Sequence, residues 1–180
     1  MRKDAQERRE RLVMAATELF TERGYEVPLE EIAARAGLGR GTLYRNFRDR
    51  ADLAVAVLEK RLDEIAAFVD EHRDDPGAFF PFLKDLAFVA FVHTPLLEGL
   101  EADQSGKGPA SALRSRAEQI FAIPLDLAQR ARLVREDLTA GDLLLAANML
   151  ASGHGPRVDD RGAVIDAAMK LLTEGLRPRE

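Results

Sequence analysis

LEEIAARAGLGRGTLYRNF, residues 29–47, carries the pattern on which the predicted fold depends. Apolar residues in its first part recur at the i, i+3, i+4 and i+7 spacing of one helical face: Leu29, Ile32, Ala33 and Ala36. Gly37 follows where a glycine commonly ends a helix. A second helix is predicted from about Arg40, because Leu43 and Phe47 lie four residues apart and share a face. The stretch therefore predicts two short helices joined by a tight turn.

The second predicted helix uses few side chains for its own core. Six positions lie off the face of Leu43 and Phe47, namely Arg40, Gly41, Thr42, Tyr44, Arg45 and Asn46. Small residues let such a helix approach a duplex, arginines bind guanine edges or phosphates, and tyrosine and asparagine suit phosphate oxygens. This pattern indicates a helix-turn-helix whose second helix enters the major groove. A helical hairpin with solvated arginines has the same spacing, so spacing alone leaves both interpretations open.

The segments AATELFTERGYE, EIAARAG and GTLYRNF occur in this order within residues 12–53. This ordered set resembles the DNA-binding domain of the TetR family of one-component bacterial regulators. The resemblance implies that Arg40, Gly41, Tyr44 and Arg45 face bases, and that Thr42, Asn46 and Arg50 face phosphates. Two positions depart from the family's pattern. Gly39 stands where serine is frequent, and Pro28 and Leu29 replace a threonine or serine that commonly caps the preceding helix and contacts a phosphate.

Composition limits the possible classes of protein. A chain of 180 residues with 46% hydrophobic content can bury one sizeable core or two small ones. No run of 18 apolar residues occurs, and the N-terminal MRKDAQERRE is charged and unlike a signal peptide. We therefore expect a soluble, cytoplasmic protein without a membrane partner. The absence of cysteine from the sequence excludes disulfides and thiolate chemistry.

The net charge of -5 argues against nonspecific nucleic-acid binding by the whole chain. Its distribution is uneven, because residues 1–50 hold 11 basic and 9 acidic residues, whereas residues 51–180 hold 15 and 22. Residues 40–50 alone carry four arginines and one aspartate, and further basic residues lie in an N-terminal arm before residue 12. We expect DNA binding through this end of the chain to be salt-sensitive.

Helical periodicity continues through the rest of the chain, and no segment is a credible strand. We expect an all-α protein of about nine helices, with no tandem repeat. Residues 1–50 are predicted to form a three-helix, helix-turn-helix DNA-binding domain, with a core of Phe20, Ile32, Leu43 and Phe47. Residues 51–180 are predicted to form a helical effector-binding and dimerisation domain.

Several residues mark where these helices begin and end. Asp49 with Asp52, and Thr139 with Asp142, have the spacing of capping boxes, and Pro76 suits a first helical position. The box at Asp49 opens a long helix that reaches about residue 73 and joins the two domains. A short helix is expected over residues 94–99 and a mobile loop over 104–109. Pro124 should bend or break the helical pattern of residues 110–135.

The last two predicted helices, over residues 139–152 and about 160–175, are broadly apolar. Pairing them with the same helices of a second copy gives a two-fold, four-helix interface. The alternative is that both helices belong to the core of one chain. A two-fold dimer also suits the DNA-binding part, because recognition helices about 34–36 Å apart fit half-sites one helical turn apart. We therefore expect a homodimer through the last two helices, which the family resemblance favours.

Residues with catalytic or metal-binding potential are scattered. The three histidines are far apart, no zinc-ligand spacing or serine-nucleophile motif is present, and the carboxylates suit capping and solvation. We therefore expect no enzyme, cofactor or metal. A phenylalanine-rich helix over residues 79–91 and a few polar groups suit a small-molecule cavity, although core packing explains the same residues. The predicted ligand-binding residues are Phe88, Phe91, His93, Phe121, Asn148 and Met149.

These observations favour a ligand-responsive, homodimeric DNA-binding regulator. Its similarity to the TetR family implies a repressor that a small molecule releases from a palindromic operator. Three other interpretations remain open: a DNA-binding regulator that answers to a protein or to no effector, a small helical enzyme, and a structural helical adaptor. The sequence does not identify the effector or the operator.

Overall fold

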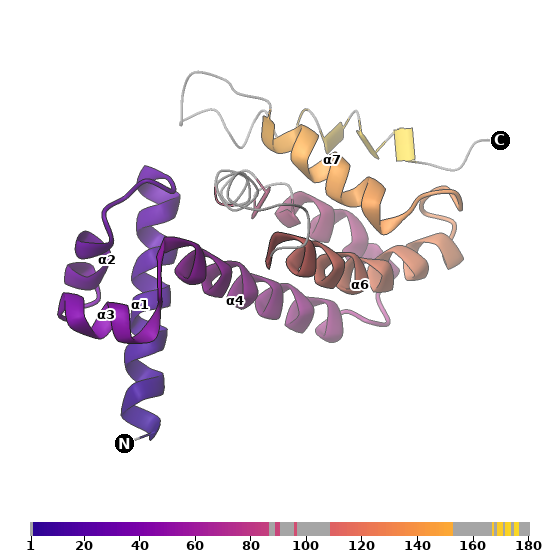
Figure 1. The fold of residues 1–180 in the computed structure, drawn as a ribbon. Helices are drawn as coiled ribbons and strands as arrows, with labels where there is room; N and C mark the ends of the chain where they lie inside the picture. The colour runs from indigo at the N-terminus through magenta and orange to yellow at the C-terminus, as the bar shows by residue number, and fades with distance from the viewer. Residues whose placement is uncertain are drawn as a thin grey trace. The chain divides into compact units, whose positions relative to one another are not determined.

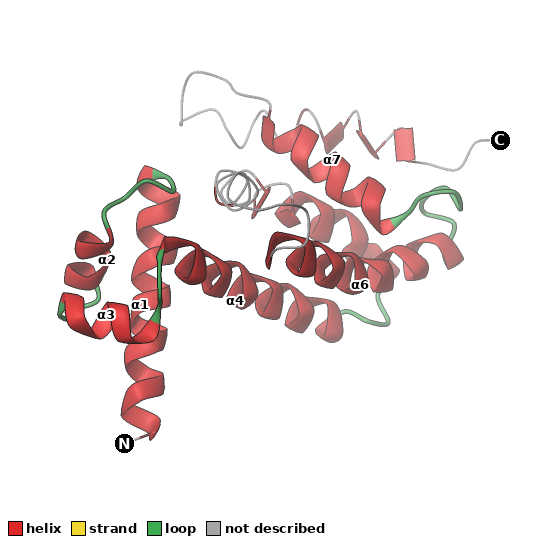
Figure 2. Ribbon diagram, in the orientation of Figure 1, coloured by secondary structure: helices red, strands yellow, loops and turns green. Residues whose placement is uncertain are grey.

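A computed structural model describes residues 2–86, 89–90, 96, 109–152, 167, 169–170, 172–173 and 175–176. Helices and short loops make up all of this described part, which contains no strand (Figure 2). The expected all-α class is confirmed. Within the same residues, no helix has both the length and the apolar character needed to cross a membrane.

Three helices form the N-terminal part: α1 (Arg2–Arg23), α2 (Leu29–Arg35) and α3 (Arg40–Asn46). Figure 1 shows α2 and α3 on one side of α1, whose first turns extend past α3. The predicted core is confirmed, because Phe20, Ile32, Leu43 and Phe47 are all at most 2% exposed. The basic residues expected in an N-terminal arm belong to α1, which begins at Arg2.

The turn between α2 and α3 requires a glycine at position 37. Gly37 has φ +64, and its amide and that of Leu38 bond back to the carbonyls of Ala34 and Ala33. The Arg11 Nη2 donates to the Ala36 carbonyl at 2.5 Å. A Cβ atom at position 37 would lie only 2.8 Å from that nitrogen. Backbone conformation and the arginine side chain therefore both select glycine here.

Helix α4 (Arg50–Glu71) begins at the cap predicted from the sequence. The Asp49 Oδ1 accepts from the Asp52 amide at 2.8 Å. The Asp52 carboxylate accepts from the Arg48 amide at 3.1 Å, one residue earlier than in a standard capping box. The start of α4 is thus fixed by side chains on both sides of its first turn.

Farther along the chain, Asp75 caps the 3-10 helix η1 (Pro76–Ala78) by accepting from the Gly77 amide at 2.9 Å. Residues 79–86 continue as α-helix. Phe82 lies 6.5 Å from Phe68 and 5.5 Å from Phe121, measured between ring centroids. These aromatic contacts join residues of α4, the 79–86 helix and α6 (Pro109–Arg130) in one apolar core.

Of the two effects expected from Pro124, a bend or a break, the break does not occur, because α6 runs through this residue and ends at Arg130. Proline removes one backbone hydrogen bond, at a cost of about 3 kcal/mol. Phe121, Leu125 and Ala128 lie on both sides of this point and are all at most 4% exposed. Burial of this continuous face holds the helix together. Arg132, in the turn that follows the helix, is a non-glycine residue with φ +56.

Helix α7 (Ala140–Ser152) begins with the predicted capping box. The Asp142 carboxylate accepts from the Thr139 amide at 2.8 Å and from its hydroxyl at 2.7 Å. The Asp142 amide lies 3.2 Å from the Thr139 Oγ1. Before this cap, the Gln129 side-chain amide bonds the carbonyls of Arg135, Glu136 and Leu138, which fixes the loop between α6 and α7.

The chain forms two compact units, residues 1–62 with 95–113, and residues 63–94 with 114–180. Helix α4 begins in the first unit and ends in the second, so the expected domain boundary at residue 50 stays a prediction. The short helix expected over residues 94–99 and the loop expected over 104–109 fall largely outside the described residues, as does most of the last predicted helix.

Candidate nucleic-acid interface

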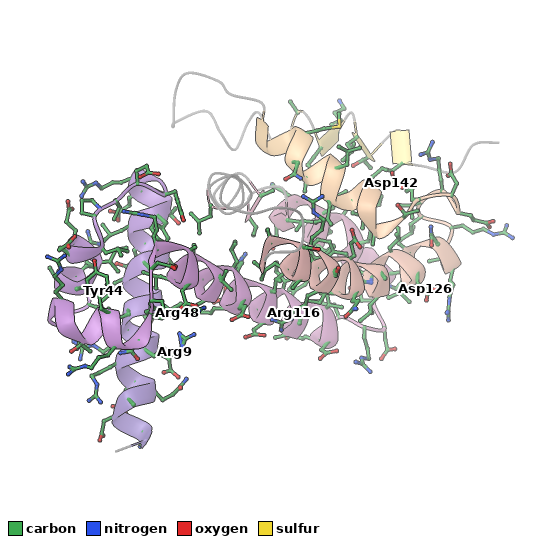
Figure 3. The ribbon with its side chains drawn as sticks, viewed as in Figure 1. Arg9, Tyr44, Arg48, Arg116, Asp126 and Asp142 are labelled. Atoms are coloured by element: carbon green, nitrogen blue, oxygen red, sulfur yellow. The ribbon has the colours of Figure 1, made fainter. Side chains whose placement is uncertain are left out.

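Helix α3 has the inner and outer sides that its spacing predicted. Leu43 is 1% exposed and fills the core, whereas Tyr44 is 43% exposed and the Arg40 side chain 68%. Arg45 is exposed as well. Figure 3 shows Tyr44 on α3, with Arg9 on α1 and Arg48 just beyond α3. A short helix thus presents cationic and aromatic side chains outwards, as reading a groove requires.

Arg40 is held in place by two neighbours. Its Nε lies 3.2 Å from the Glu30 Oε1 on α2, and its guanidinium carbon lies 5.4 Å from the centre of the Tyr44 ring. An exposed ion pair of this kind contributes little stability, at most about 1 kcal/mol. It does restrict the directions that the guanidinium can take. Glu30 is not among the predicted residues, because its position on the preceding helix carries no local signal.

The remaining predicted contacts on α3 interact with one another. The Arg45 Nη2 donates to the Thr42 Oγ1 at 3.2 Å, and the Asn46 Nδ2 donates to the Thr42 carbonyl at 2.7 Å. Gly41 is exposed, and a Cβ atom added there would meet nothing within 4 Å. The surface of α3 is therefore open at Gly41 and polar around it.

Neither α2 nor α3 has a side chain that caps its start. Pro28 precedes α2 and Gly39 precedes α3, and neither makes a side-chain cap hydrogen bond. These are the two positions where the sequence departs from the family's pattern. The departures therefore remove capping groups at both helix starts.

Arg50 has partners other than the expected phosphate. Its Nη1 donates to the carbonyl oxygens of Tyr25 and Val27, in the turn between α1 and α2. Its guanidinium carbon lies 5.4 Å from the centre of the Tyr25 ring. By contrast, the side chain of Arg48 is 89% exposed. Among the arginines near α3, the exposed Arg48 is thus better placed than Arg50 to meet a second molecule.

Arg9 also packs against the helix-turn-helix. Its guanidinium carbon lies 4.5 Å from the centre of the Phe47 ring, and Phe47 is only 1% exposed. A cation over an aromatic face contributes about 0.5–1 kcal/mol at an accessible site. Residue type predicted a basic N-terminal segment, but helical spacing could not show that Arg9 and Arg11 contact Phe47 and Ala36, the residues that follow α3 and α2.

The predicted ligand-binding residues are only partly described. Phe88, Phe91 and His93 lie outside the described residues. Phe121 is 1% exposed and packs edge-on against Phe82. Asn148 and Met149 are exposed, because α7 turns Leu143, Ala146 and Ala147 inwards instead. Of the three described residues, Phe121 is packed in the core, and Asn148 and Met149 lie on the exposed side of α7, so their ligand-binding role stays a prediction.

A groove of about 340 Å³ lies beside α7. Its apolar lining consists of Leu138, Leu145, Ala146, Met149, Leu172 and Leu176. Arg135, Asp137 and Asp142 also line it. Within the described residues, no cluster of side chains could hold a metal ion.

Comparison with known families gives two matches along the chain. Residues 12–57 match the model described as bacterial regulatory proteins, tetR family. Residues 75–178 match the model of the C-terminal domain of SbtR-like transcriptional regulators. An HTH-type transcriptional regulator of Staphylococcus aureus (strain USA300) is 42% identical over 76 residues, which are 42% of this chain and 41% of that protein. This relative therefore resembles the chain over less than half of its own length.

Solved structures match over nearly the whole chain. A TetR transcriptional regulator from Streptomyces coelicolor has a TM-score of 0.73 at 26% identity, covering 96% of this chain and 99% of that one. A TetR transcription regulatory protein from Mycobacterium vanbaalenii has a TM-score of 0.72 at 28% identity, covering 98% and 99%. A gamma-butyrolactone receptor (ArpA-like protein) has a TM-score of 0.57 at 26% identity, covering 97% and 90%. With its helix-turn-helix and a C-terminal match that spans more than half of its length, the chain belongs to the TetR family of bacterial transcriptional regulators.

Proposed function

We propose that this protein is a homodimeric repressor that binds a palindromic operator through α3 and leaves it when a small molecule binds. The observation that carries the proposal is the division of α3 into a buried side at Leu43 and an exposed side at Tyr44, Arg40 and Arg45. Membership of a family of transcriptional regulators supports DNA as the partner.

The proposed contacts divide into two kinds. Arg40, Gly41, Tyr44 and Arg45 face bases, and Thr42 and Asn46 face phosphates. The open space in front of Gly41 supports close approach of the backbone to a base edge. Arginine pairs with guanine through two hydrogen bonds, each such pair giving about 1–3 kcal/mol of discrimination.

Residues 1–50 serve as the DNA-binding domain in this proposal, and residues 51–180 as the effector-binding and dimerisation domain. Leu145 and Met149, four residues apart on α7, are 59% and 63% exposed. Together with the apolar groove beside α7, they support dimerisation through the last two helices. Two-fold pairing then places two recognition helices on successive turns of one duplex face.

The effector is proposed to act through α4, which runs from one compact unit into the other. A small organic molecule is favoured because the fold resembles that of gamma-butyrolactone receptors, at 26–27% identity over 97% of this chain. To change operator occupancy strongly, the small molecule must prefer the conformation that does not bind DNA. Its binding free energy for that conformation must be more favourable by several kcal/mol.

Selection of bound duplexes from a random pool tests the proposal directly. We expect a palindromic sequence whose half-sites lie about one helical turn apart. A pool that gives no enriched sequence would contradict operator binding. An enriched sequence without two-fold symmetry would contradict the dimer while leaving DNA binding in place.

Variants at the outer side of α3 test the proposed base contacts of Tyr44 and Arg45. Tyr44→Ala or Arg45→Ala should weaken binding to the selected duplex by about ten- to a hundredfold, because each removes a base contact worth about 1–3 kcal/mol. The dimer should persist, as measured by sedimentation. Wild-type affinity in both variants would contradict the assignment of α3 as the recognition helix.

A further inference from the structure

Arg50 lies at the first position of α4, yet its side chain binds another part of the DNA-binding unit. The Nη1 donates to two carbonyl oxygens, those of Tyr25 and Val27, which lie 25 and 23 residues earlier in the chain. The guanidinium also lies over the Tyr25 ring, and the residue is half-buried. One side chain therefore joins the start of α4 to the turn that connects α1 with α2.

The chemistry of this contact suits arginine in particular. A planar guanidinium offers several donors in a fixed geometry and stacks on aromatic rings, whereas a lysine ammonium is a compact and strongly hydrated point charge. Backbone carbonyls in a partly buried turn need donors, because an unpaired buried polar group costs about 1–3 kcal/mol. Arg50 supplies donors to two of them at once.

We propose that Arg50 is a positioning residue, which fixes the helix-turn-helix relative to the start of α4, and that its main role is not phosphate binding. This inference rests on the proposed DNA-binding function. The chain itself connects α3 to α4 through residues 47–49 only. Leu53 and Ala54, in the first turns of α4, are fully buried and also hold the start of this helix. The Arg50 contact adds an attachment at the turn before α2, which restricts rotation of the helix-turn-helix about the short connection.

The Arg50 contact also affects how a movement of α4 reaches the two helices of the helix-turn-helix. Any tilt of the first turn of α4 is passed to the end of α3 through the chain and to the start of α2 through Arg50. The two helices of the helix-turn-helix then move together with α4. Without Arg50, α4 could tilt while α2 and α3 stay in variable orientations, and a duplex would bind only the correctly oriented fraction.

Comparison of Arg50→Lys with Arg50→Met separates positioning from phosphate binding. A phosphate contact survives in the lysine variant, and in the methionine variant its loss lowers the slope of log affinity against log salt by about 0.9. A positioning contact is lost in both variants. We therefore expect both to bind the selected duplex about tenfold more weakly than wild type, with the salt slope unchanged.

Arg48→Met is the matched control, because the neighbouring Arg48 side chain is 89% exposed and its ion pair is with the Asp52 carboxylate, at 3.8 Å. It should lower the salt slope if a phosphate lies nearby, and it should leave amide hydrogen exchange in residues 24–27 unchanged. Both Arg50 variants should accelerate that exchange in the DNA-free protein. A contact that only stabilises the fold would lower the melting temperature without weakening DNA binding far below that temperature.

The outcomes are distinct. Weaker binding with an unchanged slope in Arg50→Lys, together with faster exchange in the turn, supports the proposal. Wild-type affinity and exchange in Arg50→Lys, with a reduced slope in Arg50→Met, overturns it and assigns a phosphate contact. If wild-type protein enriches no duplex, the proposed function fails instead, and the amide hydrogen exchange of residues 24–27 still decides whether Arg50 holds the turn.

Discussion

Helices α3 and α7 are built in the same way but expose different chemistry. Each buries a leucine, Leu43 in α3 and Leu143 in α7, at no more than 1% exposure. The outer side of α3 carries tyrosine and arginine, whereas that of α7 carries Leu145 and Met149. A polyanion suits the first surface and an apolar protein surface suits the second. Exposure alone therefore does not identify a site, and the exposed chemistry separates two kinds of partner.

The largest expected effect comes from giving α7 the charged character of α3. Leu145→Glu combined with Met149→Glu places two carboxylates in the proposed dimer interface, where their desolvation is costly. We expect a monomer by sedimentation velocity. We also expect at least a hundredfold weaker operator binding. In the dimer, binding of one half-site holds the second DNA-binding domain close to the other half-site, and a monomer loses this gain in affinity.

Met14→Gln is the control for this double variant. Met14 is also an exposed apolar residue, at 52%, but it lies on α1. It should leave both the oligomeric state and DNA affinity unchanged. A double glutamate variant that remains a dimer would show that the exposed side of α7 does not carry the interface.

The second prediction adds an apolar side chain to the DNA-binding side of α3, at Gly41. Gly41→Leu adds a side chain where nothing lies within 4 Å, so the free protein should be as stable as wild type or up to about 1 kcal/mol more stable. The same side chain should keep the helix away from base edges and weaken operator binding at least tenfold. Thermal unfolding and titration with the selected duplex measure the two effects.

Gly41→Ala provides the intermediate case, with a similar gain in stability and a smaller loss of affinity. Opposite signs for stability and DNA binding would show that this glycine serves the complex rather than the fold. Unchanged affinity in Gly41→Leu would place the duplex elsewhere on the domain.

The elements that the sequence predicted well depend on neighbours in the chain. Leu43 and Phe47 share a face because of helical spacing, and the Thr139–Asp142 box is visible as a three-residue interval. Pro124 shows the limit of such local reasoning. Its effect depends on the apolar surface that Phe121 and Leu125 bury on either side, which only the packed structure reveals.

In the candidate site, too, features within one helix could be predicted, whereas contacts between elements could not. The outward direction of Tyr44 could be predicted from the spacing of its own helix. The partners of Arg50 and Arg40 could not, because Tyr25 and Glu30 lie on other elements and 25 and 10 positions away in the sequence. Side-chain contacts between elements carry no periodic signal. The phosphate role first expected for Arg50 came from a family pattern that does not show where this guanidinium turns.

A smaller effect is expected from Glu30→Gln, which tests how charge near α3 affects DNA binding. The Glu30 Oε1 lies 3.2 Å from the Arg40 Nε, and the Glu30 carboxylate also places a negative charge beside the proposed DNA-binding side of α3. Its neutralisation should raise affinity for unrelated duplexes a few-fold, because less repulsion remains. It should also reduce discrimination between operator and unrelated sequence a few-fold, because Arg40 is less well oriented. Competition titrations at constant salt measure the ratio, and a ratio equal to wild type would remove Glu30 from specificity.

The smallest effect on DNA binding is expected at the start of α7, where a side-chain cap exists that α3 lacks. Hydrogen bonds from the Thr139 hydroxyl and amide lower the pKa of Asp142 from its ordinary value of 3.8, and the Arg135 charge adds a lesser contribution. Thr139→Val removes the hydroxyl and should cost about 1 kcal/mol of stability near neutral pH in urea unfolding.

The sign of the pH dependence follows from that lowered pKa. A carboxyl group whose pKa is lower in the folded protein stabilises the fold fully above its unfolded value of 3.8, and this contribution disappears as the pH falls through the lower, folded value. The difference in stability between wild type and Thr139→Val should therefore be constant above about pH 5 and should shrink in more acidic solution. A difference that grows on acidification would mean that Thr139 stabilises the protonated carboxyl instead. Because this cap fixes the turn that precedes Leu145 and Met149, its loss should weaken the dimer slightly and leave the intrinsic contacts of α3 with DNA unchanged.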